Sequence, residues 1–506
     1  MQIASLRKPG NQVFRPRRIV RTRLRRILGV PALFSIGYGD VGSSIYYGLG
    51  VVAVVALGAT PIALAAAGIV YIFNALTYAE GSAMLPEGGG SASYARNGFN
   101  DLTGFLAGWA LMLSYIITMA ISAYTIPPYL AYFWPVLRDP AVGTLVSMGI
   151  IVFLMVVNVF GIRESSGMNI LFILIDIGTQ LTLVTLGAIL ILGPHPETLF
   201  HHMFGAGNWP SAGSLVFGIA LAALCFTGVE SVSQHGEETR LPQKKMPQAY
   251  TLMIVAVLVL FAGISLVALS AMTPQVLGNA ITGWARDPVA GIAANLPSAA
   301  LRSVFAPLVS ILAATILLTA TNAGLLGISR LSYNLSSHHQ LPGTLGQVHP
   351  RFRTPYRGII IFCTISVLML SPGFFSKTFF SDLGALYVFG SLLCFTLAHA
   401  SILKLRVSRP DMERPFKLRL NLRMKGKELP LTALLGLLAT FTIWMIVIVT
   451  QPYSRWTGFG WMTIGFLVYF IYRKTRHLPV VKAPARMPEE EPVFKLPAGL
   501  KAGRRG

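Results

Sequence analysis

The chain has 506 residues, of which 54% are hydrophobic and only 12% are charged. Soluble domains usually carry about 25% charged residues, so this composition excludes an ordinary soluble enzyme. The formal net charge of +22 could indicate nucleic-acid binding. However, the basic residues lie between apolar stretches and at the chain ends, where they orient a membrane protein, so we predict no nucleic-acid partner.

Apolar stretches of about 18–25 residues recur along the chain, and each is long enough to cross about 30 Å of hydrocarbon. Lipid offers the backbone no hydrogen-bond partner, so such stretches must be helices or barrel strands, and they are too long for barrel strands. We therefore predict an all-α polytopic membrane protein with about 12 transmembrane helices in a lipid bilayer. In chain order the predicted spans are 28–56, 60–84, 101–132, 142–161, 166–193, 211–234, 249–272, 301–334, 358–372, 379–403, 430–450 and 457–473.

Lysine and arginine are distributed unequally between the loops on the two sides of these spans. When alternate loops are placed on alternate sides, 36 of the 41 basic residues fall on the side that holds both termini. Because cytoplasmic loops are enriched in Lys and Arg, we predict a protein of the cell membrane with both termini in the cytoplasm. The basic loop 404–427 could also touch anionic lipid headgroups, although orientation alone explains its charge.

The first span contains the sequence Gly-Tyr-Gly-Asp-Val-Gly-Ser-Ser-Ile-Tyr-Tyr-Gly at positions 37–48. Glycine, serine and aspartate are poor helix formers, so we expect an unwound stretch here whose amides and carbonyls bind a solute. Close packing of helices through small residues is the alternative, but it does not require Asp40.

The sixth span carries a similar segment, Phe-Thr-Gly-Val-Glu-Ser-Val-Ser at positions 226–233. Interruptions in the first and sixth spans predict two inverted repeats of five helices with a binding site between them near the membrane midplane.

In these two segments the chain resembles the amino acid–polyamine–organocation permeases. Further matching motifs are the Pro-Glu-Gly-Gly-Gly run and the segment before the third span at 86–109, the loop 161–165, the Glu-Glu-x-x-x-Pro-x-x-x-x-Pro loop at 237–247, and Arg330 with Pro342. In the first span Ser44 replaces the second glycine of the family's Gly-Ser-Gly-Ile motif. The resemblance covers about 30–475 and implies a broken-helix core of ten spans with two more appended.

This resemblance gives the expected organisation of the chain. The predicted units are a basic cytoplasmic segment 1–27, a transporter core 28–405 with inverted repeats 28–193 and 211–405, a basic cytoplasmic loop 406–429, two additional spans 430–473, and a basic cytoplasmic tail 474–506.

The resemblance also implies how a substrate is held. In such permeases the amides of the first-span break receive a carboxylate, and carbonyls of the sixth-span break receive an ammonium, as the partial charges of broken helices favour. The positions carried over are Gly42, Ser43 and Ser44 for the carboxylate, and Phe226, Thr227 and Gly228 for the ammonium. Phe226 is either a gate over the solute or a core aromatic residue.

Three acids, Asp40, Asp176 and Glu230, lie inside predicted spans. A lone charge at the bilayer centre costs at least about 2.5–3.5 kcal/mol, so these residues should face the bundle interior and are candidates for proton or cation coupling. Several proton-coupled members of the family have a lysine where this chain has Asp176, so their coupling scheme is not carried over. Asp176 could instead bind a cation, carry a proton or bond a neighbouring helix. Glu230 is expected to bond amides of the break.

A second resemblance concerns the bacterial potassium uptake permeases of the same superfamily, whose Tyr-Gly-Asp-Ile-Gly-Thr-Ser signature is similar to positions 38–44. Asp40 and Tyr47 fit the first-span pair that contacts the ion in that branch. Tyr115, Thr227 and Tyr387 fall where the branch places further oxygen ligands, but an acid expected after Tyr115 is missing.

The sequence therefore predicts a secondary active transporter that moves an amino acid or related amine and is coupled to protons. The alternatives are a potassium importer or potassium–proton symporter, and a transport-inactive sensor with the same fold. No catalytic residues, cofactor or metal site are expected, apart from the coupling ion H⁺, or K⁺ in the alternative. The partners are the small-molecule or ion substrate and the bilayer, and the sequence carries no indication of the oligomeric state.

Overall fold

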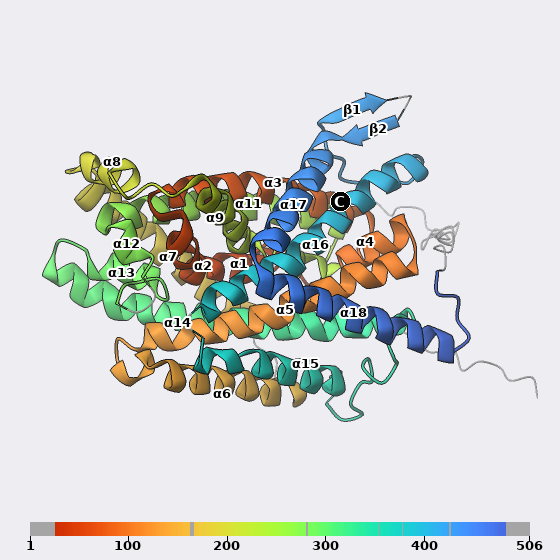
Figure 1. The fold of residues 1–506 in the computed structure, drawn as a ribbon. Coiled ribbons are helices and arrows are strands. Elements are labelled where there is room, and N and C mark those ends of the chain that lie inside the picture. The colour runs from red at the N-terminus through yellow and green to blue at the C-terminus, as the bar shows by residue number, and fades with distance from the viewer. Residues whose placement is uncertain are drawn as a thin grey trace, which may run out of the picture.

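The computed structural model describes residues 26–161, 166–279, 282–352, 354–376, 378–424 and 427–481. These residues form a bundle of long helices with one short β-hairpin (Figure 1). Nearly all of the predicted segment 1–27, most of the loop motif 161–165 and most of the tail 474–506 lie outside the described residues.

The membrane-spanning helices follow the predicted order. Ten segments of the described residues are long and apolar enough to cross a bilayer, and one of them, Val30–Met84, has 55 residues. That segment turns at Leu57, whose φ of 47° ends one helix before the next begins, so it holds the first two predicted spans. With the last long helix, Pro452–Thr475, the segments match all twelve predicted spans, and the all-α polytopic fold is confirmed.

The bounds of the elements are as follows. The helices are α1 Val30–Val41, α2 Ile45–Ala56, α3 Thr60–Met84, α4 Ser91–Gly98, α5 Asp101–Leu130, α6 Pro140–Val159, α7 Ser166–Gly187, α8 Pro196–Phe204, α9 Ala212–Ala222, α10 Glu230–Ser233, α11 Pro242–Ala271, α12 Pro274–Leu277, α13 Pro288–Ala294, α14 Ala299–Ser337, α15 Tyr356–Met369, α16 Phe379–Ser408, α17 Leu431–Thr450 and α18 Pro452–Thr475. Strands β1 Asn421–Met424 and β2 Lys427–Pro430 pair antiparallel.

The first span, formed by α1 and α2, stays helical throughout, which corrects the expectation of an unwound stretch. A single 3₁₀ turn at Gly42–Ser44 joins the two helices. Gly42 has φ −65° and ψ −30°, and its N–H donates to the carbonyl of Tyr38. The tighter hydrogen bonding of a 3₁₀ turn accommodates these poor helix formers without releasing the Gly42 amide.

The sixth span, by contrast, is interrupted as predicted. Helix α9 tightens into a 3₁₀ turn at Ala223–Phe226, and Thr227 then adopts an extended backbone with φ −81° and ψ 161°. Gly228 follows with φ 101°, a left-handed conformation that glycine adopts without steric cost. The chain becomes helical again at α10.

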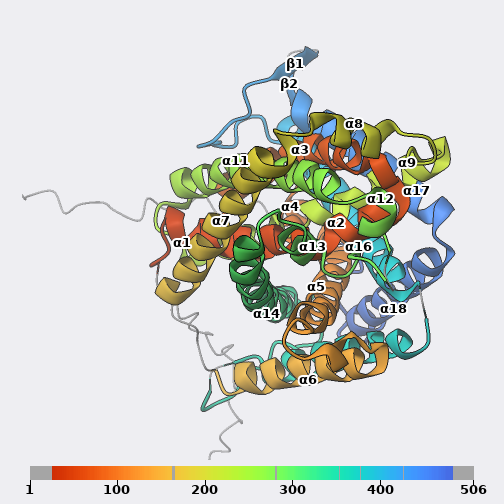
Figure 2. The ribbon, with the colours of Figure 1, turned by 90° about the vertical axis from the view of Figure 1, so that its left-hand side faces the viewer.

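The two central helices are surrounded by the rest of the bundle. In Figure 2, α1 begins at the left edge of the bundle, α7 crosses in front of the first span, α11 lies above it and α14 lies below it. Most side chains of α1 and α2 are buried, and α5 is also buried along nearly its whole length. Helices α6 and α15 pack against each other at the edge of the bundle (Figure 1).

A buried ion pair joins α3 to α16 near the ends of these helices. Arg406 donates from Nε to Glu80 Oε1 and from Nη2 to Glu80 Oε2, both at 2.7 Å. The backbone N–H of Leu418 donates to Glu80 Oε2 at 3.1 Å, so the same carboxylate holds the loop that follows α16. Both side chains are almost fully buried, with 3% and 0% exposure for Arg406 and Glu80.

We expect Arg406→Gln to lower the melting temperature of the detergent-purified protein markedly. Removing one partner of a buried pair leaves the other charge uncompensated and costs about 3–5 kcal/mol. Lys404→Gln is the matched control, because Lys404 lies on the same helix and is exposed. Thermal unfolding followed by fluorescence measures both variants, and equal melting temperatures would contradict a stabilising role for this pair.

Candidate functional site

The carboxyl group of Asp40 lies against the break in the sixth span. Ser231, in α10, donates a hydrogen bond to Asp40 Oδ2. A Cβ atom at Gly228 would lie only 2.7 Å from Asp40 Cγ, so the left-handed glycine leaves the space that this carboxyl occupies. Asp40 is 2% exposed, and its Oδ1 has no hydrogen-bond partner among the described residues. An acid with one unsatisfied buried oxygen is suited to bind a cation, an ammonium group or a proton.

Glu230 and Ser44 stabilise the break itself. Glu230 Oε2 accepts a hydrogen bond from the Gly228 N–H at 3.1 Å, as the sequence predicted for this acid. The Ser44 hydroxyl lies 2.5 Å from the carbonyls of both Val41 and Cys225, so it joins the first span to the sixth. The Ser44 contact holds the interrupted helix against the first span, and the Glu230 contact satisfies an amide within the break.

The backbone groups expected to hold a substrate are partly engaged in this conformation. The amide of Gly42 is used within the helix, and the carbonyl of Gly228 accepts from the Ser231 N–H at 3.0 Å. The Ser43 hydroxyl donates to the Asp40 carbonyl at 2.8 Å, and the Thr227 hydroxyl donates to the Leu224 carbonyl at 2.7 Å. The structure therefore brings these residues together and leaves one carboxyl oxygen of Asp40 and the hydroxyl of Tyr115 among the buried polar atoms without a partner in the described residues.

Three predicted tyrosines, Tyr47, Tyr115 and Tyr387, are buried near the same region. Helices α2 and α16, which carry Tyr47 and Tyr387, contact the 3₁₀ turn before the break, and α5, which carries Tyr115, packs against both. Tyr387 in α16 lies 2.8 Å from the hydroxyl of Thr118 in α5. The predicted residues from the first, third, sixth and tenth spans thus lie around one buried polar region.

Phe226 is packed among aromatic rings in this conformation. Its ring centroid lies 5.4 Å from that of Tyr71 in α3 and 5.3 Å from that of Phe261 in α11. Tyr71 was not predicted as a site residue, yet its buried hydroxyl has no hydrogen-bond partner among the described residues. Phe226 therefore covers the break on the side of α3 and α11. This position fits both a gate over the solute and a core aromatic residue.

Asp176 forms a second polar cluster on the other face of the first span. Its Oδ1 accepts from the Tyr46 hydroxyl at 2.5 Å, and its Oδ2 accepts from Gln180 Nε2 at 2.7 Å and from the Tyr38 hydroxyl at 3.4 Å. At about 100° per residue, Tyr38 points roughly 160° and Tyr46 roughly 120° away from Asp40 around the helix. Asp40 and Asp176 are therefore separate sites.

Sequence reasoning missed the partners of both acids. Gln180 follows Asp176 by four residues, so the helical period alone places the two side chains on one face. Ser231 follows Glu230 directly and belongs to the segment that was singled out, but only the bend at Gly228 turns its hydroxyl toward Asp40.

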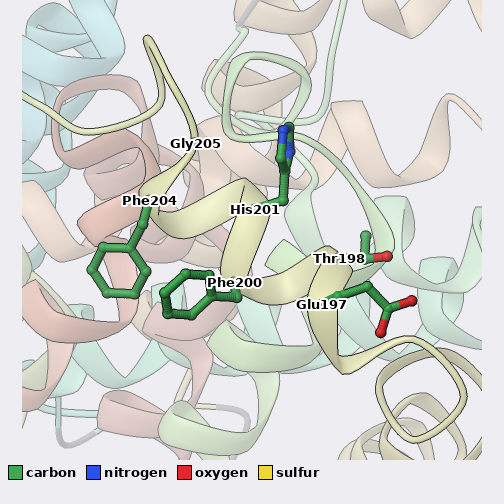
Figure 3. A pocket seen from close by; sticks show the side chains of 6 residues that line it. All are labelled: Glu197, Thr198, Phe200, His201, Phe204 and Gly205. Carbon is green, nitrogen blue, oxygen red and sulfur yellow. The ribbon is translucent and has the colours of Figure 1, made fainter.

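A surface hollow of about 690 Å³ lies beside α8, away from these residues (Figure 3). It is lined by Phe200, Phe204 and His201 together with Glu197 and Thr198. Because none of the predicted site residues lines this hollow, we place the candidate site at the helix break instead.

The chain was compared with known proteins. The sequence profile of the amino acid permease family matches residues 28–471. The branched-chain amino acid permease BcaP of Bacillus subtilis is 27% identical over 479 residues, which cover 89% of this chain and 94% of the permease. The methylthioribose transporter of the same organism is 28% identical, with 90% and 95% covered. The human large neutral amino acids transporter small subunit 2 is 26% identical, with 81% and 73% covered.

The matched region runs from the start of the first span almost to the end of the last, and it includes the interrupted sixth span and both buried acids of the first and fifth spans. This chain belongs to the amino acid permease family, within the amino acid–polyamine–organocation superfamily.

Proposed function

We propose that this protein is a proton-coupled secondary transporter that carries a neutral amino acid, or an organic solute of similar size, across the cell membrane. Both termini lie in the cytoplasm in this proposal, because the side that holds them carries 36 of the 41 basic residues. The names of the relatives, two amino acid transporters and a methylthioribose transporter, support an organic solute rather than potassium.

The observation that carries the proposal is the unsatisfied oxygen of Asp40 beside the break in the sixth span. Burying an acid inside a membrane protein costs free energy, so an acid at such a position usually has a function. Here the acid lies between the first and sixth spans, where carbonyl groups of the broken helix and the unpartnered, buried hydroxyl of Tyr115 could complete a site for an ammonium group.

The Asp176 cluster supports proton coupling. As a carboxylate, Asp176 can accept hydrogen bonds from Tyr38, Tyr46 and Gln180 at the same time, which holds α7 against the first span. A protonated Asp176 has an O–H donor in place of one acceptor site, and this new donor needs an acceptor, which the Tyr46 oxygen can supply by reversing the direction of its hydrogen bond. Protonation would therefore change the hydrogen bonding between α7 and the first span, which is a physical route from proton binding to a change in the balance of conformations.

Uptake into proteoliposomes tests the proposal. Purified protein would be reconstituted, and uptake of labelled leucine would be measured with and without an inward proton gradient, in competition with the other amino acids and methylthioribose. Uptake that the gradient stimulates and that neutral amino acids inhibit is the expected result. Potassium-dependent rubidium uptake without amino acid uptake would favour the ion importer. Ligand-induced thermal stabilisation without any uptake would favour a sensor.

We expect Asp176→Asn to abolish accumulation driven by the proton gradient while retaining exchange of labelled for unlabelled substrate. Asparagine can keep hydrogen bonds to its neighbours but cannot gain or lose a proton at physiological pH. The two activities are measured separately in the same proteoliposomes. Asp411→Asn, at an exposed position, is the control and should retain both. Unimpaired gradient-driven accumulation in Asp176→Asn would exclude this acid from coupling.

A further inference from the structure

The β-hairpin between α16 and α17 projects from the bundle. In both Figure 1 and Figure 2, strands β1 and β2 extend beyond the edge of the helices. Because the two views differ by a quarter turn about the vertical axis, the projection is a property of the fold and not of one viewing direction. The hairpin therefore projects from the bundle at the ends of α16 and α17, the two helices that it contacts.

Both ends of this hairpin are held at the ends of spanning helices. Strand β2 ends at Pro430, and α17, an apolar helix of 20 residues, begins at the next residue. On the other side, Leu418 is fixed by its hydrogen bond to Glu80, four residues before the end of α3. The hairpin is thus confined to the level where the spans leave the hydrocarbon, which is the level of the lipid headgroups.

The strand register gives the hairpin an apolar face. Leu422 pairs with Leu429 across the strands, and the Leu431 N–H donates to the Leu420 carbonyl two pairs further along, just beyond the ends of the strands. Residues two apart on a strand share a face, so these leucines all lie on one side. Leu420 is 63% exposed and Leu422 is 39% exposed. This leucine face has too little cover from the described residues to be part of the core.

Basic side chains lie on both faces of the hairpin: Lys427, which pairs with Met424, shares the face of the leucines, whereas Arg423, which pairs with Glu428, lies on the opposite face. Arg419, Arg423 and Lys427 are all exposed, and the Arg423 side chain has 84% exposure. The neighbouring Lys417 is paired with Glu428, the only acid within 417–424 and 427–430. Glu428 also lies 3.6 Å from Arg423. One acid is therefore shared by two of the four basic side chains in these ranges, and the hairpin keeps a net positive charge.

We propose that this hairpin binds the anionic lipid headgroups of the leaflet next to it, with its leucine face toward the acyl chains and Arg419, Arg423 and Lys427 on the headgroups. Apolar and basic side chains side by side match a membrane surface, where a layer of charged headgroups covers the hydrocarbon of the acyl chains. The anionic charge of the cytoplasmic leaflet complements the hairpin. Through Glu80 and Arg406, a docked hairpin is joined to the second and tenth spans.

A fluorescent label on the hairpin tests this inference without relying on transport. Leu422→Cys can be labelled selectively, because the three native cysteines are buried. The labelled protein would be placed in nanodiscs of phosphatidylcholine, or of phosphatidylcholine with phosphatidylglycerol, each containing a nitroxide-labelled lipid that quenches nearby fluorophores. We expect strong quenching only with phosphatidylglycerol, and reversal of that quenching in high salt.

Charge-removing variants sharpen the test. Arg419→Gln, Arg423→Gln and Lys427→Gln together should reduce the response to phosphatidylglycerol to the level in phosphatidylcholine, since each basic side chain contributes roughly five-fold to association. The matched control removes three exposed basic residues elsewhere, by Lys244→Gln, Lys474→Gln and Arg476→Gln, and should keep the response. The proposal would be overturned if quenching were equal in both lipids, or if the quenching that depends on phosphatidylglycerol persisted in the triple hairpin variant. It would also be overturned if the label were protected from both lipid and aqueous quenchers. Substrate uptake can fail or succeed independently of this result.

Discussion

Replacing Gly228 with alanine should abolish uptake, because this position combines two restrictions. Its φ of 101° is a conformation that costs other residues about 1–3 kcal/mol. An alanine Cβ would also lie 2.7 Å from Asp40 Cγ and 3.0 Å from the backbone nitrogen of Val41. Relieving that overlap would move the sixth span away from the first, or displace the Asp40 carboxyl. Initial rates of uptake in proteoliposomes measure the effect, which we expect to exceed tenfold, roughly the effect of 1.4 kcal/mol.

Gly213→Ala is the matched control, since Gly213 belongs to the same interrupted span. It lies in α9 with helical neighbours, and a Cβ added there would meet no atom within 4 Å. Alanine is favoured over glycine inside helices by up to about 1 kcal/mol, so this variant should be as stable as the native protein or slightly more stable. If Gly228→Ala transported as well as Gly213→Ala, the left-handed turn would not be needed for the site.

The membrane fold could be predicted from the sequence because it depends on one-dimensional properties. Stretch length and apolarity determine which segments cross the bilayer, and the distribution of basic residues between loops agrees with their number. Hydropathy alone is insufficient at two places. Val30–Met84 is one continuous apolar segment, and only the turn at Leu57 divides it into two spans. The helix Pro452–Thr475 is not among the ten most apolar segments, and its last turn carries charged side chains. The β-hairpin at 421–430 was not predicted, because its strands are only four residues long.

The site was predicted less completely, because composition does not distinguish a tightened helix from a broken one. The first and sixth spans both contain glycine, hydroxyl side chains and an acid, yet only the sixth loses its helical backbone. The difference lies at Gly228, whose positive φ follows an extended Thr227, whereas Gly42 remains in a helical conformation. Pairings such as Asp40 with Ser231, 191 residues apart, depend on the packing of distant helices and leave no local signal.

We expect Asp40→Asn to abolish uptake without lowering expression or thermal stability. Asparagine has nearly the same shape, so it can keep its place against Gly228 and its hydrogen bond with Ser231. What it loses is the negative charge, which the proposed site needs to bind an ammonium group or a proton. A loss of transport in a stably folded variant would therefore identify the charge, and not the packing, as the essential property of this residue.

Two further variants separate the charge from its surroundings. Asp382→Asn removes an acid from the start of α16, where it bonds Thr378 at the protein surface, and should transport normally. Ser231→Ala removes the hydrogen-bond donor but keeps the charge, so uptake should fall less than in Asp40→Asn and should recover in Ser231→Thr, which restores the hydroxyl. Unchanged uptake in Asp40→Asn would remove this acid from the mechanism, whatever the two other variants do.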